Sequence, residues 1–172
     1  MIRKIFCGGR FPFDCRDENY IEQAKQDYRA FLLKDVKRLL ERAVEVKIND
    51  RVLYVGPFYF ETKDMCDKDI VACEVEMIKE CTDAIFLLED GSCPGTVGEM
   101  VFAAGLGKHV IVFYVVDEKE TESVLQAPCW HPMLLTRCIN VETDLVACED
   151  QEDAVFKIMK YINEIGGCNK NE

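Results

Sequence analysis

Residues 83–99 read DAIFLLEDGSCPGTVGE, and this stretch decides the fold class of the chain. The apolar run Ala84–Leu88 is typical of a buried strand, and a short glycine-containing loop separates it from a helical pattern. In a parallel α/β sheet, such a junction lies at the carboxyl edge of the strands, where ligands bind. Glu99 stands at the start of the helix beside Gly95 and Gly98, whose missing Cβ atoms would leave its carboxylate open to approach.

Glu99 has two interpretations that the local sequence leaves open. The segment Thr96–Glu99 fits a capping box, in which Thr96 caps the helix and Glu99 accepts from the Thr96 backbone N–H. Alternatively, Glu99 is a catalytic carboxylate at the ligand-binding edge. Gly98 favours the second interpretation, because glycine within a helix costs up to about 1 kcal/mol relative to alanine, which suggests that something requires the space.

The rest of the chain alternates strand and helix patterns. Strands are expected at Arg3–Cys7, Val52–Val55, Ala84–Leu88, His109–Val116 and Cys138–Val141. Helices are expected at about 19–44, then at Asp67–Cys81, Thr96–Leu106 and Gln151–Ile165. This alternation predicts a parallel sheet covered on both faces, and the right-handed crossover rule then favours a flavodoxin-like three-layer sandwich. We expect a five-stranded parallel sheet of order 2-1-3-4-5, in one domain over residues 1–166 with a polar tail at 167–172.

The composition excludes several classes of partner. A net charge of −11 argues against binding to nucleic-acid backbones or anionic membranes, because both require a basic surface. No apolar run approaches the ~18 residues of a membrane span, and no apolar segment near the N-terminus resembles a secretory signal. We therefore expect a cytoplasmic protein that binds a small molecule.

Ten cysteines and two histidines do not form a recognisable metal site or disulfide framework. No CxxC pair or Cys/His cluster occurs at zinc spacing. Cys66, Cys73 and Cys81 recur on one face of a predicted helix, which favours small core residues. His109 opens a strand at the opposite edge from Glu99, which favours a structural role. We expect neither a metal nor a cofactor.

In the expected sheet, the segments that follow the strands collect around Glu99. They contribute glycine-bearing turns, aromatic side chains and one arginine, and the fourth segment leads to Trp130. None contains a GxxxxGK[ST] phosphate loop, a GxGxxG dinucleotide motif or a GxSxG elbow. The Ser/Thr-rich loop of a flavodoxin-type FMN site is also missing after the first strand. The predicted binding residues at this edge are Gly8, Gly9, Arg10, Gly56, Pro57, Tyr59, Ser92, Gly95 and Gly98.

Three blocks of the sequence resemble the nucleoside 2-deoxyribosyltransferase family: Lys4–Gly9, Ile78–Asp83 and Pro94–Val110, of which the third is the most specific. The resemblance covers residues 1 to about 116. It implies the flavodoxin-like fold and a nucleophile, Glu99, that attacks C1′ of the sugar. The sugar would then pass to another base or, as in the related deoxynucleotide N-glycosidases, to water. Such chemistry requires a carboxylate facing an oxocarbenium-like transition state, and a nearby helix N-terminus is expected to keep Glu99 ionised.

The chain departs from the family pattern at two positions. Phe6 stands where the family usually has a tyrosine that orients the glutamate, and Tyr54 or Tyr59 could replace it. Val75 stands where some members have a substrate-binding aspartate, although Glu74 and Glu76 flank it. The loop before Glu99 is closer in length to that of the N-glycosidases, whose serine and arginines bind a 5′-phosphate. Ser92 and Arg10 are the corresponding candidates here.

We therefore expect an enzyme that cleaves or transfers the N-glycosidic bond of a (deoxy)nucleoside or nucleotide. The alternative is a non-catalytic nucleotide- or nucleotide-sugar-binding domain of the same fold. The resemblance also implies a homo-oligomer, a dimer or higher, whose sites are completed by a neighbouring subunit. The segment Pro128–Pro132 with Trp130 is the expected contributor, unless Trp130 is a buried core residue.

Overall fold

A computed structural model describes residues 1–9, 46–56, 67–88, 94–116 and 129–167. The strands are β1 (Arg3–Gly9), β2 (Val46–Asn49), β3 (Val52–Gly56), β4 (Asp83–Leu88), β5 (His109–Val115) and β6 (Thr143–Cys148). The helices are α3 (Asp67–Glu80), α4 (Pro94–Gly105), α5 (Trp130–Ile139) and α6 (Gln151–Ile165). The helix predicted at 19–44 lies outside the described residues.

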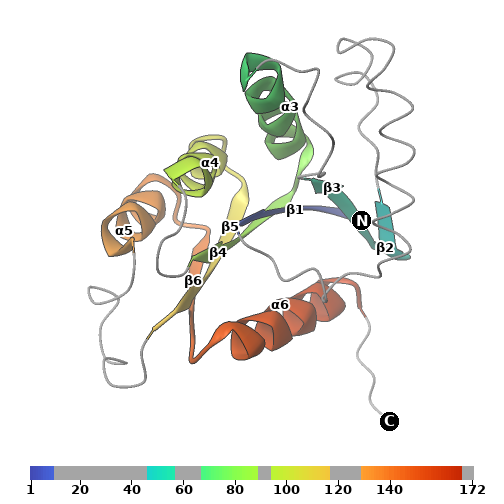
Figure 1. The fold of residues 1–172 in the computed structure, drawn as a ribbon. Coiled ribbons are helices and arrows are strands. Elements are labelled where there is room, and N and C mark those ends of the chain that lie inside the picture. Colours follow the sequence, from blue (N-terminus) through green and yellow to red (C-terminus); the bar gives the residue numbers. More distant parts are fainter. Residues whose placement is uncertain (10–45, 57–66, 89–93, 117–128, 168–172) are drawn as a thin grey trace.

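The described strands form one mixed sheet in the order β2-β3-β1-β4-β5-β6 (Figure 1). The α/β class is confirmed, but the sheet has six strands and is not wholly parallel, so its count and order differ from the predicted five-stranded parallel sheet of order 2-1-3-4-5. Without the edge strand β2, the order β3-β1-β4-β5-β6 is the predicted one. The sheet has an additional edge strand, β2, which pairs antiparallel with β3. These two strands form a hairpin, because the Asn49 side chain accepts a hydrogen bond from the Arg51 backbone N–H (2.9 Å) and closes an Asx turn. All other neighbouring strands are parallel.

The last strand was also predicted in the wrong place. Residues 138 and 139 belong to the end of α5, and the strand forms at Thr143–Cys148 instead. Pro132 does not prevent the helix, since it lies in the first turn, where no backbone N–H has a helical partner. Met133 and Thr136, three residues apart, are both buried and give α5 its buried face.

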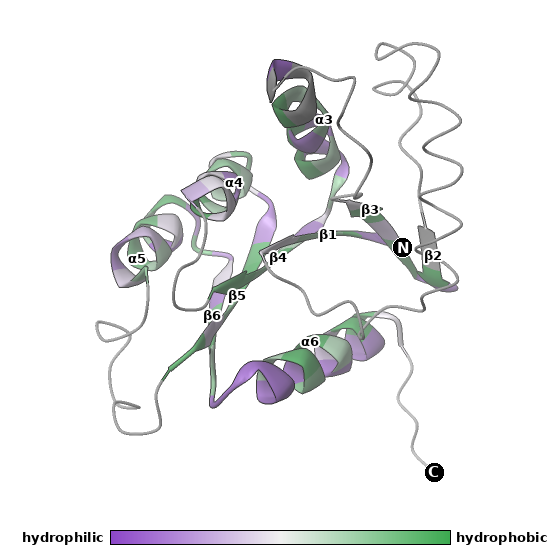
Figure 2. Cartoon of the chain, in the orientation of Figure 1, coloured by the Kyte–Doolittle hydropathy of each residue, from purple (hydrophilic) through white to green (hydrophobic). Residues whose placement is uncertain are grey.

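Helices cover both faces of the sheet (Figure 1). Alternate residues along a strand point to opposite faces, so the core has two halves. Phe6, Phe86 and Val112 lie in the half covered by α3, α4 and α5, and Ile5, Ile85 and Ile111 lie in the half covered by α6. Figure 2 shows the resulting hydropathy pattern, with the central strands apolar and a hydrophilic side on α6.

Two of the three regularly spaced cysteines are core residues, as predicted. Cys73 and Cys81 are buried, and Cys66 lies outside the described residues. Among the described helices, none has the length and apolarity needed to cross a bilayer.

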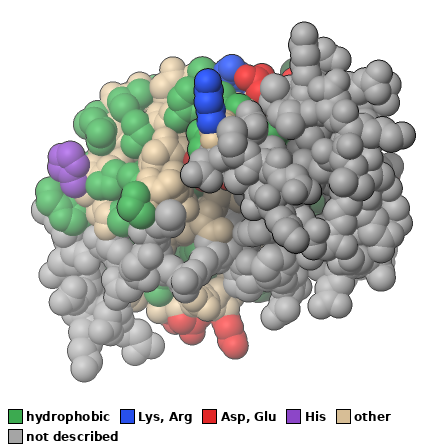
Figure 3. Space-filling model, turned by 45° about the horizontal axis from the view of Figure 1, so that its top comes forward, with side chains coloured by type: hydrophobic (Ala, Val, Ile, Leu, Met, Phe, Trp, Pro, Cys, Tyr) green, Lys and Arg blue, Asp and Glu red, His purple; other side chains and the backbone are tan. Residues whose placement is uncertain are grey.

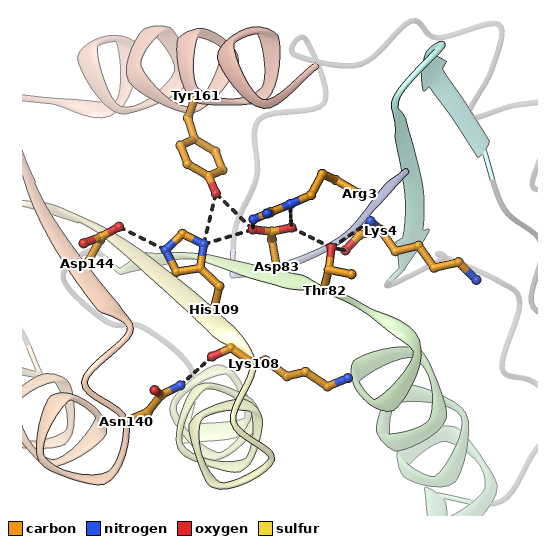
Figure 4. A network of polar contacts seen from close by, with 9 residues as sticks. All are labelled: Arg3, Lys4, Thr82, Asp83, Lys108, His109, Asn140, Asp144 and Tyr161. Carbon is orange, nitrogen blue, oxygen red and sulfur yellow. Dashed lines mark hydrogen bonds and ion pairs between the residues drawn. The ribbon is translucent and has the colours of Figure 1, made fainter. Parts of the chain in front are cut away.

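The amino edge of the sheet is held together by the buried carboxylate of Asp83 (Figure 4). Asp83, at the start of β4, is fully buried and accepts hydrogen bonds from both Nε (2.7 Å) and Nη2 of Arg3. The Thr82 hydroxyl donates to it over 2.6 Å and the Tyr161 hydroxyl over 3.0 Å. Its neighbour His109 lies 2.9 Å away through Nδ1. This cluster joins β1, β4, β5 and α6.

These contacts confirm the structural role of His109 and set the charge of Asp83. His109 lies between two carboxylates, because its Nε2 is 3.1 Å from Asp144 Oδ2. Burial alone would raise the pKa of Asp83, but the hydrogen bonds from Arg3, Thr82 and His109 outweigh burial and hold that pKa below its usual value.

Candidate functional site

Glu99 lies at the opposite, carboxyl edge of the sheet, where α4 begins. The helix starts at Pro94, which suits a first position because its missing N–H would have no helical partner. Thr96 is a buried residue inside the helix, so it is not the N-cap. The capping-box interpretation of Glu99 is therefore wrong, because the helix begins two residues before the residue that was to cap it.

The carboxylate of Glu99 lies over the end of β1. Gly8 shows this, because a Cβ atom there would be 3.0 Å from Glu99 Oε2 and 2.5 Å from the Phe86 ring. Real Cβ atoms do not approach ring carbons that closely, so only glycine allows Phe86 and Glu99 to occupy these positions. Gly8 thus makes room for the carboxylate of Glu99.

The environment of Glu99 favours its neutral form. Burial raises the pKa of Glu99 to about 7, and the nearby negative charge of Glu74 contributes to the same shift. In the part of the chain that the structure describes, Glu99 has neither a hydrogen bond nor an ion pair that would hold its charge. The expectation that the helix N-terminus keeps Glu99 ionised is wrong. The residue is the sixth of α4, beyond the first turn, in which the helix dipole acts most strongly.

At two other predicted binding positions, contacts within the protein explain why the residue is glycine. Gly9 has φ +100°, and a Cβ there would come within 2.4 Å of the Leu87 carbonyl oxygen. Gly56 has φ +143°, and a Cβ there would come within 2.5 Å of Met77 Sδ on α3. Both glycines end strands at the carboxyl edge, as expected, but the atoms that require their small size belong to the protein.

The glycines of α4 behave differently. Gly95 and Gly98 are exposed, and a Cβ atom at Gly98 would meet no atom within 4 Å. Packing against the described residues therefore does not explain a glycine at 98, one residue from the half-buried Glu99 carboxylate. This open helix surface remains the predicted approach for a ligand. The predicted binding residues that lie outside the described residues are Arg10, Pro57, Tyr59 and Ser92.

Tyr54, one of the two candidates to replace the tyrosine that is missing at position 6, does not lie beside Glu99. Phe6 is fully buried in the same half of the core as α4, with its ring 6.1 Å from that of Phe86. Tyr54 belongs to the other half of the core, on the α6 side of the sheet. Its hydroxyl therefore cannot take the place of the missing one, and Tyr59 lies outside the described residues.

Trp130 is a surface residue, so its interpretation as a buried core tryptophan is wrong. It opens α5 at the carboxyl edge with 41% of its surface exposed, and its ring lies edge-on to that of His131. Leu135 and Ile139 on α5 and Leu106 after α4 are also exposed. Figure 3 shows apolar side chains gathered on this side of the molecule. A contribution of Trp130 to a neighbouring subunit stays a prediction.

Sequence reasoning did not include Glu74 in the site. This residue lies on α3, is half-buried, and has a pKa that burial raises above the ordinary value. The helical periodicity of the sequence could have revealed it, since Glu74 shares a helical face with the apolar Ile78 and Cys81.

Over the described residues, no group of three or more metal-ligating side chains occurs.

The chain was compared with known proteins. No family model and no curated protein matches it. Among solved structures, the CMP N-glycosidase BcmB of Clostridium botulinum is similar with a TM-score of 0.47 and 16% identity, over 92% of this chain and 99% of that one. The translation elongation factor SelB of Methanococcus maripaludis, in complex with the GTP analogue GppNHp, is similar with a TM-score of 0.46 and 9% identity, over 97% of this chain and 34% of that one. Neither similarity identifies a site residue.

Proposed function

We propose that this protein cleaves or transfers the N-glycosidic bond of a (deoxy)nucleoside or nucleotide, with Glu99 as the nucleophile. The observation that supports this most directly is the position of the Glu99 carboxylate. It is half-buried at the carboxyl edge of the sheet, it lies over the side-chain-free end of β1, and its hydrogen-bonding capacity is unused within the described residues. The sequence resemblance of Pro94–Val110 to the nucleoside 2-deoxyribosyltransferases supplies the reaction.

In the proposed reaction, ionised Glu99 forms a bond from a carboxylate oxygen to C1′ while the bond from C1′ to the base nitrogen breaks. The negative carboxylate stabilises the positive charge that develops on the sugar in an oxocarbenium-like transition state. The base leaves with the electron pair of the broken bond and takes up a proton from solvent. In the second step, a nitrogen of an acceptor base, or water, attacks C1′, loses its proton to solvent and releases the Glu99 carboxylate. A net retention of configuration follows from these two displacements.

A panel of deoxynucleosides and their 5′-monophosphates, each with and without an acceptor base, tests this proposal. Release of free base only with an acceptor identifies a transferase, and release without one identifies a hydrolase. Turnover of the monophosphates alone would support 5′-phosphate binding by Arg10 and Ser92. If no compound is turned over between pH 5 and 9, the proposed activity is wrong.

A second candidate function is a non-catalytic nucleotide- or nucleotide-sugar-binding domain. It is favoured by Phe6 and Tyr54, since position 6 offers no hydroxyl and Tyr54 faces the other side of the sheet. This candidate predicts that a nucleotide raises the melting temperature without any bond cleavage. It also predicts the same increase in a Glu99→Gln variant, because a non-reacting carboxylate is not needed for binding.

The proposed site includes a contribution from a second copy of the chain, through Trp130. Exposure of this large aromatic side chain at the carboxyl edge supports that part of the proposal. Light scattering at micromolar concentration tests it, with a dimer or higher assembly expected. A monomer under these conditions would exclude a shared site.

A further inference from the structure

His109 opens β5 at the amino edge of the sheet and contacts a carboxylate on each neighbouring strand (Figure 4). Its Nδ1 is 2.9 Å from Asp83 Oδ1 on β4, and its Nε2 is 3.1 Å from Asp144 Oδ2 on β6. An ionised carboxylate only accepts hydrogen bonds, so each contact requires a proton on the ring nitrogen that makes it. Both contacts therefore exist together only when His109 carries a proton on each nitrogen and is positively charged.

The other polar groups around the ring gather on its Nδ1 side. The Tyr161 hydroxyl on α6 is 3.2 Å from Nδ1 of His109 and donates to Asp83 Oδ1 over 3.0 Å. Arg3 on β1 binds the same carboxylate. Asp83 thus keeps two further donors, the Arg3 guanidinium and the Tyr161 hydroxyl, whatever the protonation of His109.

The Nε2 side of the ring is simpler. Lys108, the neighbour of His109 in the chain, donates from Nζ to the Lys79 carbonyl on α3 over 2.6 Å. Among the described residues, the hydrogen-bonding contact of Nε2 is with Asp144 alone. The link between the side chains of His109 and Asp144 consequently depends on one proton.

The two carboxylates differ in what they lose with a proton of the ring. The side chain of Asp83 is fully buried, whereas that of Asp144 is 65% exposed. Water replaces a lost donor at an exposed carboxylate but does not reach a buried one, which would keep the full cost of the missing hydrogen bond. When His109 becomes neutral, its remaining proton should therefore stay on Nδ1. The unprotonated Nε2 and the Asp144 carboxylate then face each other as two acceptors, and this contact is lost.

We propose that His109 is a pH-sensitive link between β5 and the edge strand β6. The proton on Nε2 forms the ion pair with Asp144, and its loss breaks this pair while the hydrogen bond from Nδ1 to Asp83 persists. β6 is the last strand in the order of the described sheet and pairs there with β5 only, so the ion pair adds a side-chain connection to a strand held on one side. This proposal does not depend on the proposed function.

The sign of the effect follows from linkage. The folded protein offers the charged ring a partner, Asp144, that the unfolded chain does not hold in place. The link therefore stabilises the fold at acid pH, and its contribution disappears as the pH rises through the titration of His109. The carboxyl group of Asp83 contributes in the opposite direction, because its pKa is lowered in the folded state.

The protonation of each ring nitrogen can be observed directly in wild-type protein by long-range ¹H–¹⁵N correlation spectra of ¹⁵N-labelled histidine, recorded from about pH 5 to about pH 9. Nδ1 of His109 should stay protonated throughout, and Nε2 should lose its proton. His131, which is exposed on α5, is the internal reference and should take the form with the proton on Nε2, as neutral histidine does in water. A neutral His109 that keeps its proton on Nε2 would overturn the proposal, as would a ring whose protonation does not change over this range.

Asp144→Asn tests the partner of the second proton. Without the carboxylate, the titration midpoint of His109 should move to lower pH by roughly 0.5–1 pH unit, the lower end of the range for a neighbouring charge because the pair is partly exposed. The matched control, Glu142→Gln, removes one negative charge two residues away and keeps Asp144, so it should move the midpoint much less. An equal shift in both variants, or none in Asp144→Asn, would show that Asp144 does not hold the proton. The spectra of the wild-type protein remain decisive if this variant does not fold.

Urea unfolding of the same pair of proteins measures the link as stability. Wild type should unfold at a higher urea concentration than Asp144→Asn below the titration midpoint of His109, and the difference should vanish above it. A difference that is the same on both sides of the midpoint would mean that Asp144 stabilises the protein independently of the proton on His109, and the proposal would be wrong.

Discussion

Two acidic residues of this protein illustrate how burial acts with and without partners. Asp83 is fully buried, yet hydrogen bonds from Arg3, Thr82 and His109 hold its pKa below the usual range. Glu99 is only half-buried, but without such partners in the described residues its pKa rises to about 7. A carboxylate satisfied by the protein suits a structural role, whereas an unsatisfied one beside an open helix surface suits a reaction.

Replacement of Glu99 by alanine separates a catalytic from a structural role. If Glu99 is the nucleophile, Glu99→Ala should reduce turnover by at least roughly 10²–10⁴, as for the loss of a positioned catalytic group. A 2-fluoro-2-deoxyribosyl substrate should also leave a covalent adduct on the Glu99 peptide, visible by mass spectrometry. An active enzyme that forms no such adduct, and whose Glu99→Ala variant keeps full activity, would exclude this mechanism.

The raised pKa of Glu99 also predicts how stability depends on pH. In the unfolded chain this carboxyl group has its ordinary pKa near 4.5, and in the folded protein about 7. Between these values the folded state binds the proton more tightly, so the contribution of Glu99 to stability falls as the pH rises through this window. Glu99→Gln should therefore unfold at higher urea concentration than wild type at pH 8, with a smaller difference at pH 5. A difference in stability between Glu99→Gln and wild type that is equal at pH 5 and pH 8 would contradict the raised pKa of Glu99.

At the scale of elements, the end of β1 and the start of α4 form the candidate site together. Substitution of one glycine in each element separates the effect of packing on stability from the effect of ligand approach on binding. Gly8→Ala places a Cβ atom against Phe86 and Glu99, so it should cost about 1–3 kcal/mol and lower turnover. Gly98→Ala fills open space on a helix, so it should stabilise the protein by up to about 1 kcal/mol. If ligand approaches over α4, Gly98→Ala nevertheless raises KM. Urea unfolding and steady-state kinetics on both variants measure these effects, and an unchanged KM in Gly98→Ala would place the ligand elsewhere.

Elements whose own residues determine their structure could be predicted from the sequence, and those determined by tertiary context could not. The helix predicted at Gln151–Ile165 is confirmed at both ends, because Asp150 caps it and Ala154, Ile158 and Ile162 recur on its buried face. The strand predicted at Cys138–Val141 is wrong, because a short apolar segment does not reveal its period.

The candidate site was predictable to a similar degree. The place of Glu99 followed from the strand–loop–helix pattern of residues 83–99. The protonation state of Glu99 could not be predicted from the sequence, because its burial and the influence of Glu74 depend on how α3 packs against α4. The glycines at 8, 9 and 56 were correctly placed at the carboxyl edge, but their reason is contact with Phe86, Leu87 and Met77, which only the tertiary structure reveals.

On the scale of the whole molecule, the two edges of the sheet have separate roles. The carboxyl edge carries the candidate site, and the amino edge carries the hydrogen-bonded cluster around Asp83, which connects three strands of the sheet to α6 (Figure 4). Because the cluster is remote from Glu99 along the strands, changes there should alter stability without altering the chemistry of the folded protein.

Arg3 tests this separation. Arg3→Met leaves the buried Asp83 carboxylate without its charged partner and should lower the free energy of unfolding by about 3–5 kcal/mol. Lys4→Met is the control on the same strand: the side chains of Lys4 and Glu80 keep 29% and 53% of their surface exposed, so the loss should stay within about 1 kcal/mol. Urea unfolding at pH 7 measures both, and turnover per folded molecule should match wild type in each.

The same variant also predicts a characteristic dependence on acid. The pKa of Asp83 is lowered in the folded state, so its stabilisation is complete above the unfolded value of about 3.8 and disappears as the pH falls through the lower folded value. Without Arg3, burial dominates and raises the pKa of Asp83, so protonation in the variant begins at higher pH. The difference in unfolding free energy between wild type and Arg3→Met should therefore be largest near neutral pH. It should begin to shrink as the pH falls through the raised pKa of Asp83 in the variant, above the ordinary value of about 3.8, and continue to shrink at lower pH. A difference that stays constant from pH 7 to pH 3 would show that Arg3 stabilises the protein by packing alone and not through the charge of Asp83.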